Sequence, residues 1–390
     1  FTTCQKPRPE FDGFVSVHPL TQFSESEIVL ATAARNFAQT VIKPLVSEMD
    51  ENSEMNKNII RGCFENGFMG AEIGEEYGGP GASFFDVLLV AEELAKVDPS
   101  VATLVDVQNT LVTLLIIDYG TEYQKNKYLP RLHQDFVGSF CLSEANSGSD
   151  AFAMKTVAKR DNDEYVINGT KMWISNAEYA DFFLFANAEP KKGYKGITAF
   201  LNKMGIRASS TCPIYFDNVR VPSTMVLGEV GTGYKLAMKC LNVGRIGIGA
   251  QMVGLAEGCY EQSIFHIQER KQFNKRIIDF QSVQHQIADL RTQIECARLL
   301  VYNASRLLQA GLPHIMEASM AKWFASVVAN NTASKCVELL GGVGFSKQSP
   351  IEKFYRDAKI GTIYEGTTNI NLNTIAKLVD MEYLKRQAKA

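Results

Sequence analysis

The chain has 390 residues, of which 46% are hydrophobic and 21% charged, and this composition excludes a largely disordered protein. Its 40 Lys and Arg nearly balance its 43 Asp and Glu, so a protein that grips nucleic acid or an anionic membrane through charge is disfavoured. The most apolar stretch, residues 101–117, contains Asp106, Gln108 and Asn109. We therefore expect no transmembrane segment.

The cysteines and histidines argue against a metal site. The eight Cys form no CxxC pair, and the five His form no HExxH motif. Most of the cysteines stand among apolar residues, which predicts buried free thiols in a reducing compartment. The chain begins with Phe1, so the sequence leaves open whether a targeting segment preceded it.

The first part of the chain is predicted to be helical. Ser24 and Glu27 form a capping-box pattern ahead of apolar residues at helical spacing. Further helices are expected at 54–68, 84–97, 101–118 and 121–132. Residues 78–81, which read Gly-Gly-Pro-Gly, cannot continue a helix and are predicted to be a loop.

The middle of the chain, from about 136 to 228, is predicted to be β-rich. Residues 164–169 read as a strand that runs into a turn at Asn168 and Gly169. Other strands are expected at 182–186, 197–201 and 214–219. This region is large enough for a small barrel or sandwich.

Helical periodicity returns at about 232. Long patterns run over 232–268, 282–310, 314–340 and 350–378, and they suit a four-helix bundle with faces left for another subunit. The fold class is therefore α+β and mostly α. We expect three domains, at 1–135, 136–231 and 232–390.

The common nucleotide-binding motifs are missing. The Gly-rich segment at 228–235 places Lys235 one position late for a Walker A loop, and the glycines at 341–344 follow a helix rather than a strand. No G-x-S-x-G elbow is present. Any nucleotide must therefore be bound in another way.

Two segments of the β-rich region could contact a planar heterocycle. Residues 140–150 combine small polar side chains with a glycine, which exposes hydrogen-bonding groups. Trp173 stands two residues before Ser175 on a predicted strand, so the indole and the hydroxyl share a face. Taken singly, a segment like 140–150 is more often a solvated turn, and a tryptophan like Trp173 more often packs in a half-buried position.

Two segments of the C-terminal region contain charged residues that could bind a ligand or take part in catalysis. Arg270 opens the basic run 270–276 and could pair with a pyrophosphate, although an ordinary interhelical turn has the same composition. Glu365 follows Ile363 and Tyr364 and precedes Gly366. Apolar surroundings would raise the pKa of this carboxyl toward the range of a general base; a surface Glu that caps a helix would have the same local sequence.

In this order and on this α-β-α pattern, the four segments resemble those of the acyl-CoA dehydrogenase family, from about residue 23 to 380. Segments 138–145, 207–213, 244–248 and 357–366 resemble the subgroup for short and 2-methyl-branched acyl-CoA. The resemblance implies a helical N-terminal domain, a central β-barrel-like domain and a C-terminal four-helix bundle, assembled as a homotetramer. It also implies FAD, electron-transfer flavoprotein as the electron acceptor, and the mitochondrial matrix.

The resemblance assigns residues to roles. Glu365 matches the catalytic base; in some relatives the base directly precedes the matching Arg, but that position here is Gly244, which has no acid. The residues that match FAD contacts are Phe140, Cys141, Leu142, Ser143, Ser149, Trp173, Ile174, Ser175, Arg270, Phe273, Gln281, Glu338, Leu339, Leu340, Gly341, Gly342, Thr367, Thr368 and Asn369, some of them toward the FAD of a neighbouring subunit. The residues that match acyl-CoA contacts are Ser149, Tyr194, Tyr234, Asn242, Val243, Gly244, Arg245, Tyr364 and Gly366.

Three departures from the family pattern are visible. Asn146 and Asn274 stand where the family usually has Gly, and Asn tolerates left-handed backbone. About fourteen residues of a turn and strand are lacking between Leu201 and Asn202. We expect that the printed sequence omits them rather than that the protein has lost them, because loss of a barrel strand would expose a sheet edge.

The resemblance implies that Glu365 removes the α-proton of the thioester while the β-hydrogen passes to the flavin as hydride. The same residues serve the reverse reaction, so a 2-methyl-branched enoyl-CoA reductase stays open. An acyl-CoA oxidase and a non-catalytic scaffold on the same fold stay open as well.

Overall fold

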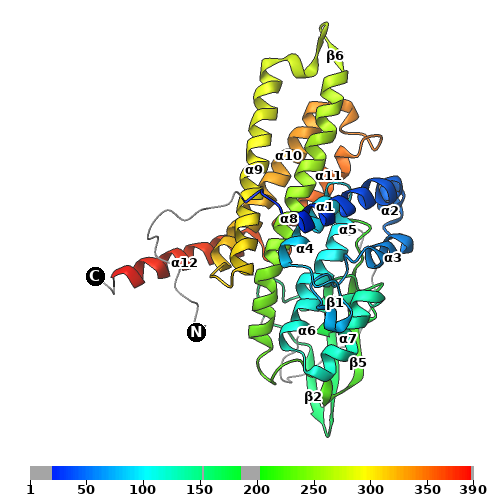
Figure 1. The fold of residues 1–390 in the computed structure, drawn as a ribbon, viewed down its shortest axis with the longest axis vertical. Helices are drawn as coiled ribbons and strands as arrows, with labels where there is room; N and C mark the ends of the chain where they lie inside the picture. Colours follow the sequence, from blue (N-terminus) through cyan, green and yellow to red (C-terminus); the bar gives the residue numbers. More distant parts are fainter. Residues whose placement is uncertain (1–19, 152, 186–202, 388–390) are drawn as a thin grey trace.

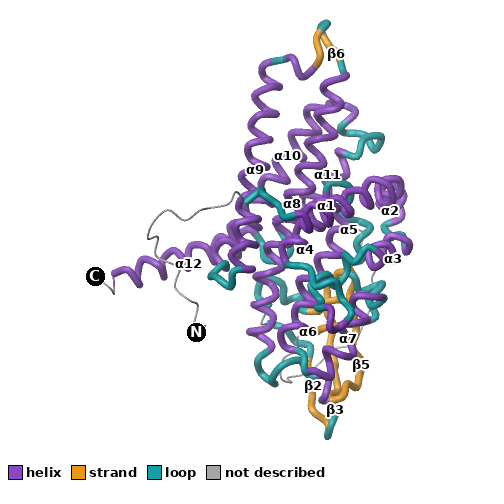
Figure 2. The backbone as a smooth tube through the Cα atoms, in the orientation of Figure 1, coloured by secondary structure: helices purple, strands orange, loops and turns teal. Residues whose placement is uncertain are grey.

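The computed structural model of the chain describes residues 20–151, 153–185 and 203–387, and helices, strands and helices follow one another as predicted (Figure 1). The expected strand at 197–201, Tyr194 and the junction between Leu201 and Asn202 lie outside the described residues. Figure 2 shows that helices dominate, that most strands gather at one end of the molecule, and that a short hairpin at β6 (Lys271–Gln272) lies at the opposite end.

The N-terminal helices begin where the sequence predicts. The α-helices of this region are α1 (Glu25–Phe37), α2 (Val46–Asn52), α3 (Lys57–Glu65), α4 (Phe84–Ala95), α5 (Pro99–Asp106), α6 (Leu114–Tyr119) and α7 (Glu122–Gln134). The capping box is confirmed, because the Glu27 amide donates to Ser24 Oγ at 3.2 Å and the Ser24 amide donates to Glu27 Oε2 at 2.8 Å. The loop at 78–81 is also confirmed, with Gly78 at φ +80°.

The predicted helix at 101–118 is a composite of α5, a π-helical stretch η4 (Val107–Thr113) and α6. The segment Pro99–Tyr119 is long and apolar enough to span a membrane by length and composition, but 89% of its most apolar window is buried inside the protein. Burial of this kind is typical of a core helix.

The strands form two small sheets beside these helices. Strand β1 (Gly138–Cys141) pairs in parallel with β4 (Phe182–Phe185), and Gly138 lies opposite Phe182. Strand β3 (Glu164–Ser175) lies between β2 (Val157–Asp161) and β5 (Thr211–Pro222), antiparallel to both.

The predicted turn at Asn168 and Gly169 is wrong. Strand β3 continues through both residues, with a shift of register against β5 between Ile167 and Gly169. Gly169 has φ +149°, and a Cβ atom there would lie 2.5 Å from Thr156 Oγ1, so only glycine fits this bulge. The reversal into β3 lies instead at Asn162, which has φ +56°.

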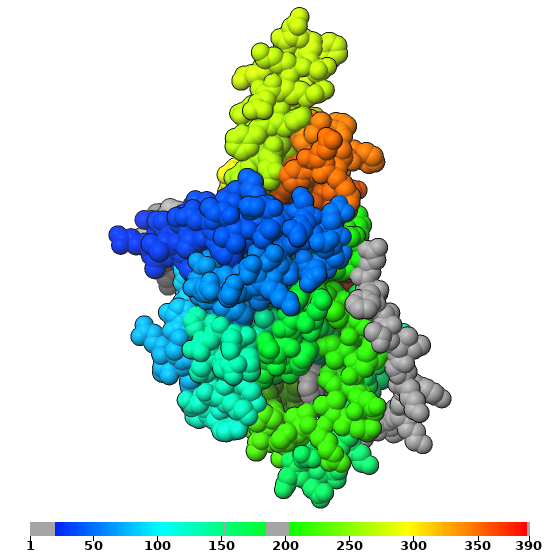
Figure 3. All heavy atoms as spheres, turned by 90° about the vertical axis from the view of Figure 1, so that its right-hand side faces the viewer, coloured from blue at the N-terminus to red at the C-terminus, as the bar shows by residue number. Residues whose placement is uncertain are grey.

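Long helices build the C-terminal region. They are α8 (Gly233–Glu269), α9 (Gln281–Gln309), α10 (Ile315–Leu340), α11 (Ile351–Ala358) and α12 (Thr368–Gln387). Helices α8 and α9 project beyond the body toward the short hairpin of β6 (Lys271–Gln272) and β7 (Lys275–Arg276) (Figures 1 and 3). In this hairpin Asn274 adopts the expected left-handed conformation (φ +58°), whereas Asn146 does not.

The single helix predicted at 350–378 is wrong. The chain forms α11, then a 3₁₀ turn η8 (Lys359–Thr362), then residues 363–367 outside any helix, then α12. Helix α12 contacts α10 at its start and then leaves the body (Figure 1); within residues 368–387, Asn371 is the one buried residue. Three long helices therefore carry the core of the bundle within one chain, and the fourth extends away from it.

The main core lies where α4 meets α8, α9 and α10, and it includes Phe85, Leu88, Ile246 and Leu255. The prediction of free, mostly buried thiols is confirmed for the described cysteines: Cys63, Cys141, Cys240, Cys259 and Cys336 are buried, Cys212 is half-buried and Cys296 is exposed. The described residues hold no cluster of metal-ligating side chains.

Candidate active site

Glu365 lies in the break between α11 and α12. Its backbone is left-handed, with φ +51°, and the following Gly366 has φ +91°. An L-residue other than Gly, Asn or Asp rarely adopts this conformation, so the fold holds a strained residue at the predicted base. Its Oε2 atom is buried and has no hydrogen-bond partner among the described residues.

Burial raises the pKa of the Glu365 carboxyl to about 7, while the nearby charges of Lys322 and Arg245 lower it. At neutral pH such a carboxyl exists in both protonation states. It can therefore either accept or return a proton, which is what a general base requires.

Helix α8 makes room for this carboxyl with glycine. A Cβ atom on Gly244 would lie 3.0 Å from Glu365 Oε2 and 3.1 Å from Leu111 Cδ2. Gly244 cannot be the base because it has no acidic side chain. The structure shows that the Glu365 carboxyl occupies the space next to it.

Arg245, next on α8, is buried, and its Nη1 donates to Asn242 Oδ1 at 2.8 Å. Its Nε has no partner among the described residues. Desolvation lowers the pKa of this guanidinium, and the Glu365 carboxylate opposes that shift. An unpaired donor on a buried cation beside Glu365 suits the binding of a polar ligand.

A second carboxyl lies on the same face of α8, one turn further along. A Cβ atom on Gly247 would overlap with Asp106 Oδ1, and both carboxylate oxygens of this buried residue lack a partner among the described residues. Burial first, and then the Glu365 charge, raise the pKa of Asp106 well above its usual range. Burial and the neighbouring carboxyl therefore both favour the protonated form of Asp106.

The predicted heterocycle-binding segments lie side by side. The Met172 amide donates to the Ser143 carbonyl at 2.9 Å. The buried Lys171 ammonium donates to the Leu142 carbonyl and to Glu144 Oε1, each at 3.0 Å. The loop at 140–150 is thereby bound to β3 beside Trp173.

Trp173 is 53% exposed, with φ +64° at a register shift of β3, whereas Ile174 is buried and Ser175 half-buried. The register shift between Lys171 and Ile174 interrupts the regular alternation of the strand, so the shared face of the indole and the Ser175 hydroxyl stays a prediction. A half-exposed indole beside a hydroxyl fits a ring-stacking surface better than a packing role.

The predicted pyrophosphate-binding residues also come together. Arg270 lines a cavity of about 430 Å³ with Ile277 and residues 338–343. Gly341 has φ +60°, and Cβ atoms on Gly341 and Gly342 would meet nothing within 4 Å, so the backbone here is open to a ligand. Phe273 (89% exposed) and Gln281 lie at the projecting end of α8 and α9.

The remaining predicted residues take these positions. Tyr364 donates its hydroxyl to Gln251 Oε1 at 2.7 Å, Val243 is buried on α8, Tyr234 is 55% exposed at the start of α8, and Ser149 is exposed in the loop before β2. Thr367 directly precedes α12, and Thr368 and Asn369 open that helix, close to Glu365 in the chain.

The sequence reasoning missed Lys322, Asp106 and Gly247 as parts of the site. Lys322 is 1% exposed on α10 and faces Glu365. The sequence carried a signal for it, because the lysine occupies a core-facing position between the buried Ala318 and Ala325. In the sequence, Asp106 stands out only as a charge that interrupts an apolar stretch.

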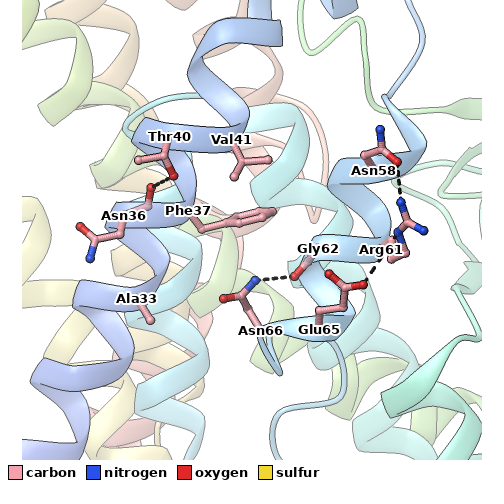
Figure 4. Close-up of a pocket in the computed structure, with 10 residues that line it drawn as sticks. All are labelled: Ala33, Asn36, Phe37, Thr40, Val41, Asn58, Arg61, Gly62, Glu65 and Asn66. Atoms are coloured by element: carbon pink, nitrogen blue, oxygen red, sulfur yellow. Dashed lines mark hydrogen bonds and ion pairs between the residues drawn. The ribbon is translucent and has the colours of Figure 1, made fainter.

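A surface pocket of about 580 Å³ lies elsewhere, between α1 and α3 (Figure 4). Arg61 and Glu65 at its edge pair with each other at 3.8 Å. None of its lining residues belongs to the predicted sites.

Comparison with known proteins decides the family. Models described as the N-terminal, middle and C-terminal domains of acyl-CoA dehydrogenase match residues 24–135, 139–219 and 231–379. The rat protein named short/branched chain specific acyl-CoA dehydrogenase, mitochondrial, is 58% identical over 94% of this chain and 88% of its own length. The chain belongs to the acyl-CoA dehydrogenase family.

Solved structures of this family share the fold. Butyryl-CoA dehydrogenase from Megasphaera elsdenii is 36% identical and covers 92% of this chain and 99% of its own, with a TM-score of 0.88. A glutaryl-CoA dehydrogenase from Mycobacterium smegmatis, described in complex with FADH2, is 28% identical over 92% and 95% of the two chains, with a TM-score of 0.85. The α+β, mostly α fold class predicted from the sequence is thereby confirmed as that of an acyl-CoA dehydrogenase.

Proposed function

We propose that this acyl-CoA dehydrogenase oxidises short and 2-methyl-branched acyl-CoA thioesters to trans-2-enoyl-CoA, with FAD as cofactor and Glu365 as the catalytic base. The observation that carries the proposal is a carboxyl on a strained backbone, whose buried Oε2 has no hydrogen-bond partner within the described part of the chain and whose pKa is raised to about 7. The branched preference is supported by the 58% identity to the rat relative named for such substrates.

The chain has surfaces that fit FAD. The half-exposed Trp173 and Ser175 suit the ring system, and the cavity that joins Arg270 to Gly341 and Gly342 suits a pyrophosphate. We assign the FAD-contacting and acyl-CoA-contacting roles to the residues predicted from the resemblance. When bound, FAD supplies the hydride acceptor that no side chain can provide.

The residues of the chain account for the proton chemistry. An α-proton of a thioester is a weak acid, so the base must be close, correctly oriented and shielded from water. The left-handed backbone at Glu365, the glycine beneath it at Gly244 and the burial of Oε2 meet these needs. Backbone N–H groups beside Glu365 would hold the thioester oxygen as it gains negative charge.

The pKa of the Glu365 carboxyl is also relevant to the direction of the reaction, which is either oxidation of acyl-CoA or reduction of enoyl-CoA. Because its pKa is about 7, comparable amounts of the acid and its conjugate base exist near neutrality. The acid form can return a proton to an enoyl-CoA, and the base form can remove one from the acyl-CoA. The reductase direction is therefore a second candidate function.

We further propose electron-transfer flavoprotein as the electron acceptor, a homotetramer, and the mitochondrial matrix as the location. The outward-directed α12 and the exposed Phe273 support an assembly, because each leaves apolar surface without cover in one chain. The mitochondrial name of the rat relative supports the location. We propose domains at 1–135, 136–231 and 232–390, supported by the change to strands at Gly138 and back to helix at Gly233.

The test is anaerobic bleaching of the flavin in the purified FAD-loaded protein. The 2-methylbutanoyl thioester of CoA should bleach it faster than hexanoyl-CoA, and Glu365→Gln should slow bleaching at least about 100-fold. Glu76→Gln, which neutralises an exposed Glu on the N-terminal region, is the matched control and should change nothing. Normal bleaching by Glu365→Gln would refute the assignment of the base, and chemically reduced protein mixed with 2-methyl-enoyl-CoA measures the reverse direction.

A further inference from the structure

Helix α10 presents three polar side chains, each one turn apart, to the segment that carries Glu365. Asn330 donates to the Ala358 carbonyl at 2.8 Å, Ser326 donates to the Gly361 carbonyl at 2.8 Å, and Lys322 donates to the carbonyls of Gly361 and Gly366 at 2.6 and 2.7 Å. The spacing of four residues places all three on one face of the helix. The backbone from 358 to 366 is therefore tied to α10 along its length.

Lys322 has a special place among the three. Its two carbonyl partners stand at either end of the break in which Glu365 lies, and its side chain is 1% exposed. Its ammonium also lies 6.0 Å from the centre of the Tyr364 ring. A lysine is rarely buried to this degree without a carboxylate bonded to it, so two backbone carbonyls as its partners call for a functional reason.

The reason lies in the conformation between those carbonyls. Glu365 adopts a left-handed φ of +51°, which costs free energy and persists only when the surroundings fix it. A side chain that bonds the carbonyls before and after this residue fixes both ends of the strained segment. Asn371 adds one further bond to the Gly366 carbonyl at 2.8 Å.

We propose that Lys322 is a positioning residue for Glu365: it bridges the Gly361 and Gly366 carbonyls, holds the left-handed backbone between them, and thereby aims the carboxyl at the α-carbon of the acyl thioester. This inference rests on the proposed role of Glu365. Burial lowers the pKa of Lys322 to about 7, but a neutral amine still has two N–H donors, one for each carbonyl. The bridge therefore survives deprotonation.

Lys322 also acts on Glu365 through its charge. The groups that face this carboxyl are Lys322 from α10, Arg245 and Cys240 from α8, Asp106 from the end of α5, and the adjacent Tyr364. The two cations, Lys322 and Arg245, lower the pKa of Glu365. Removal of Lys322 must therefore raise the pKa of Glu365, because the carboxylate loses one of its two cationic neighbours.

Three variants separate the bridge from the charge. Lys322→Met removes both while keeping the length of the side chain, and Lys322→Gln keeps a donor for one carbonyl but no charge. Ser326→Ala removes one neutral hydrogen bond to the same Gly361 carbonyl and serves as the matched control. The measurements are the rate of anaerobic flavin bleaching by 2-methylbutanoyl-CoA across the pH range on both sides of neutrality, the dissociation constant of that thioester, and the retained flavin absorbance.

We expect Lys322→Met to bleach about 10- to 100-fold more slowly at every pH, because an error of about an ångström or less in the position of a catalytic group has an effect of this size. In the plot of bleaching rate against pH, the acidic limb of this variant should move to higher pH by about half a pH unit to one pH unit. Lys322→Gln should recover part of the rate but show the same shift, and Ser326→Ala should show no shift. The dissociation constant should change less than about threefold in all three, because none of these side chains is proposed to touch the thioester.

The proposal is overturned if both Lys322 variants retain flavin and bleach within about twofold of the unmodified protein, with the acidic limb unmoved. It is equally overturned if neither variant yields flavin-loaded protein, because Lys322 would then serve stability rather than Glu365. The controls separate these results from a failure of the proposed function. In that case the unmodified protein would not bleach, or Glu365→Gln would bleach normally.

Discussion

The glycine at 244 offers a direct test of how tightly the fold holds the base. Substitution Gly244→Ala places a methyl group 3.0 Å from Glu365 Oε2 on one side and 3.1 Å from Leu111 Cδ2 on the other. Both distances are a few tenths of an ångström shorter than ordinary contacts. The methyl group cannot move away from the carboxyl without pressing on Leu111, so Glu365 must give way.

The expected magnitudes follow from this geometry. A displacement of about half an ångström at a catalytic group corresponds to roughly a tenfold loss of rate, or about 1.4 kcal/mol in the barrier. The effect on folding should be small. Alanine gains up to about 1 kcal/mol over glycine inside a helix, and overpacking a core costs about 1–3 kcal/mol. We therefore expect the free energy of unfolding to change by about 1 kcal/mol or less while the reaction slows about tenfold.

The assay compares anaerobic flavin bleaching with urea denaturation for the same variant. Gly233→Ala is the control, because a Cβ atom there would meet nothing within 4 Å at the start of the same helix. The control should leave the bleaching rate unchanged, and helix propensity should raise its free energy of unfolding by no more than about 1 kcal/mol. If Gly244→Ala bleaches at the normal rate, the carboxyl does not occupy the place above Gly244 in the working enzyme and the reasoning is wrong.

Three further predictions concern stability and the cofactor. Gly247→Ala forces a methyl group onto Asp106 Oδ1 and should lower the free energy of unfolding by about 2–3 kcal/mol. When Asp106→Ala is added to the same chain, most of the lost stability should return, which a double-mutant cycle of urea unfolding measures. Because the folded pKa of Glu365 is raised from 4.5 to about 7, its carboxyl favours folding below pH 4.5 and that contribution is lost as pH rises through 7. Glu365→Gln should therefore match the unmodified protein in unfolding free energy at about pH 4 and exceed it by about 3 kcal/mol at about pH 8, and equal values at both would contradict the raised pKa. Arg270→Gln should weaken FAD retention about tenfold in gel filtration followed by absorbance, whereas Lys271→Gln beside it should not.

The pair of glycines on α8 explains how two carboxyls coexist beside one helix. Gly244 and Gly247 lie three residues apart and so share a face, and each accommodates an acid from another part of the chain. Two like charges this close cannot both ionise at low cost, so one carboxyl keeps its proton. Burial of both of its oxygens favours Asp106 as the carboxyl that keeps its proton, whereas Glu365 has two cations nearby that favour its ionised form.

Much of the site could be predicted from the sequence, once the local patterns were joined by the resemblance to a family. The motif around Glu365 combines an acid, apolar neighbours and a glycine, and all three features act in the structure. Arg270 and the glycines at 341 and 342 stand about seventy residues apart in the sequence, yet they line one cavity, as the resemblance implies. The predicted turn at Gly169 and the unbroken helix at 350–378 were wrong, because a glycine signals freedom of the backbone without saying whether a turn, a bulge or a break uses it.

The sequence by itself determined the order of helices and strands and the caps that begin the helices, because these depend on residues close together in the chain. The acid proposed to do the chemistry was identified through the resemblance of the whole chain to a family, because its local sequence also suits a surface residue that caps a helix. Only the tertiary structure decided that Lys322 and Arg245 face Glu365, that Gly244 lies beneath it, and that burial raises the pKa of Asp106. The pKa of a carboxyl is set by its burial and by the charges around it in space, and here those charges belong to Lys322 and Arg245, which are both more than forty residues away from Glu365 in sequence.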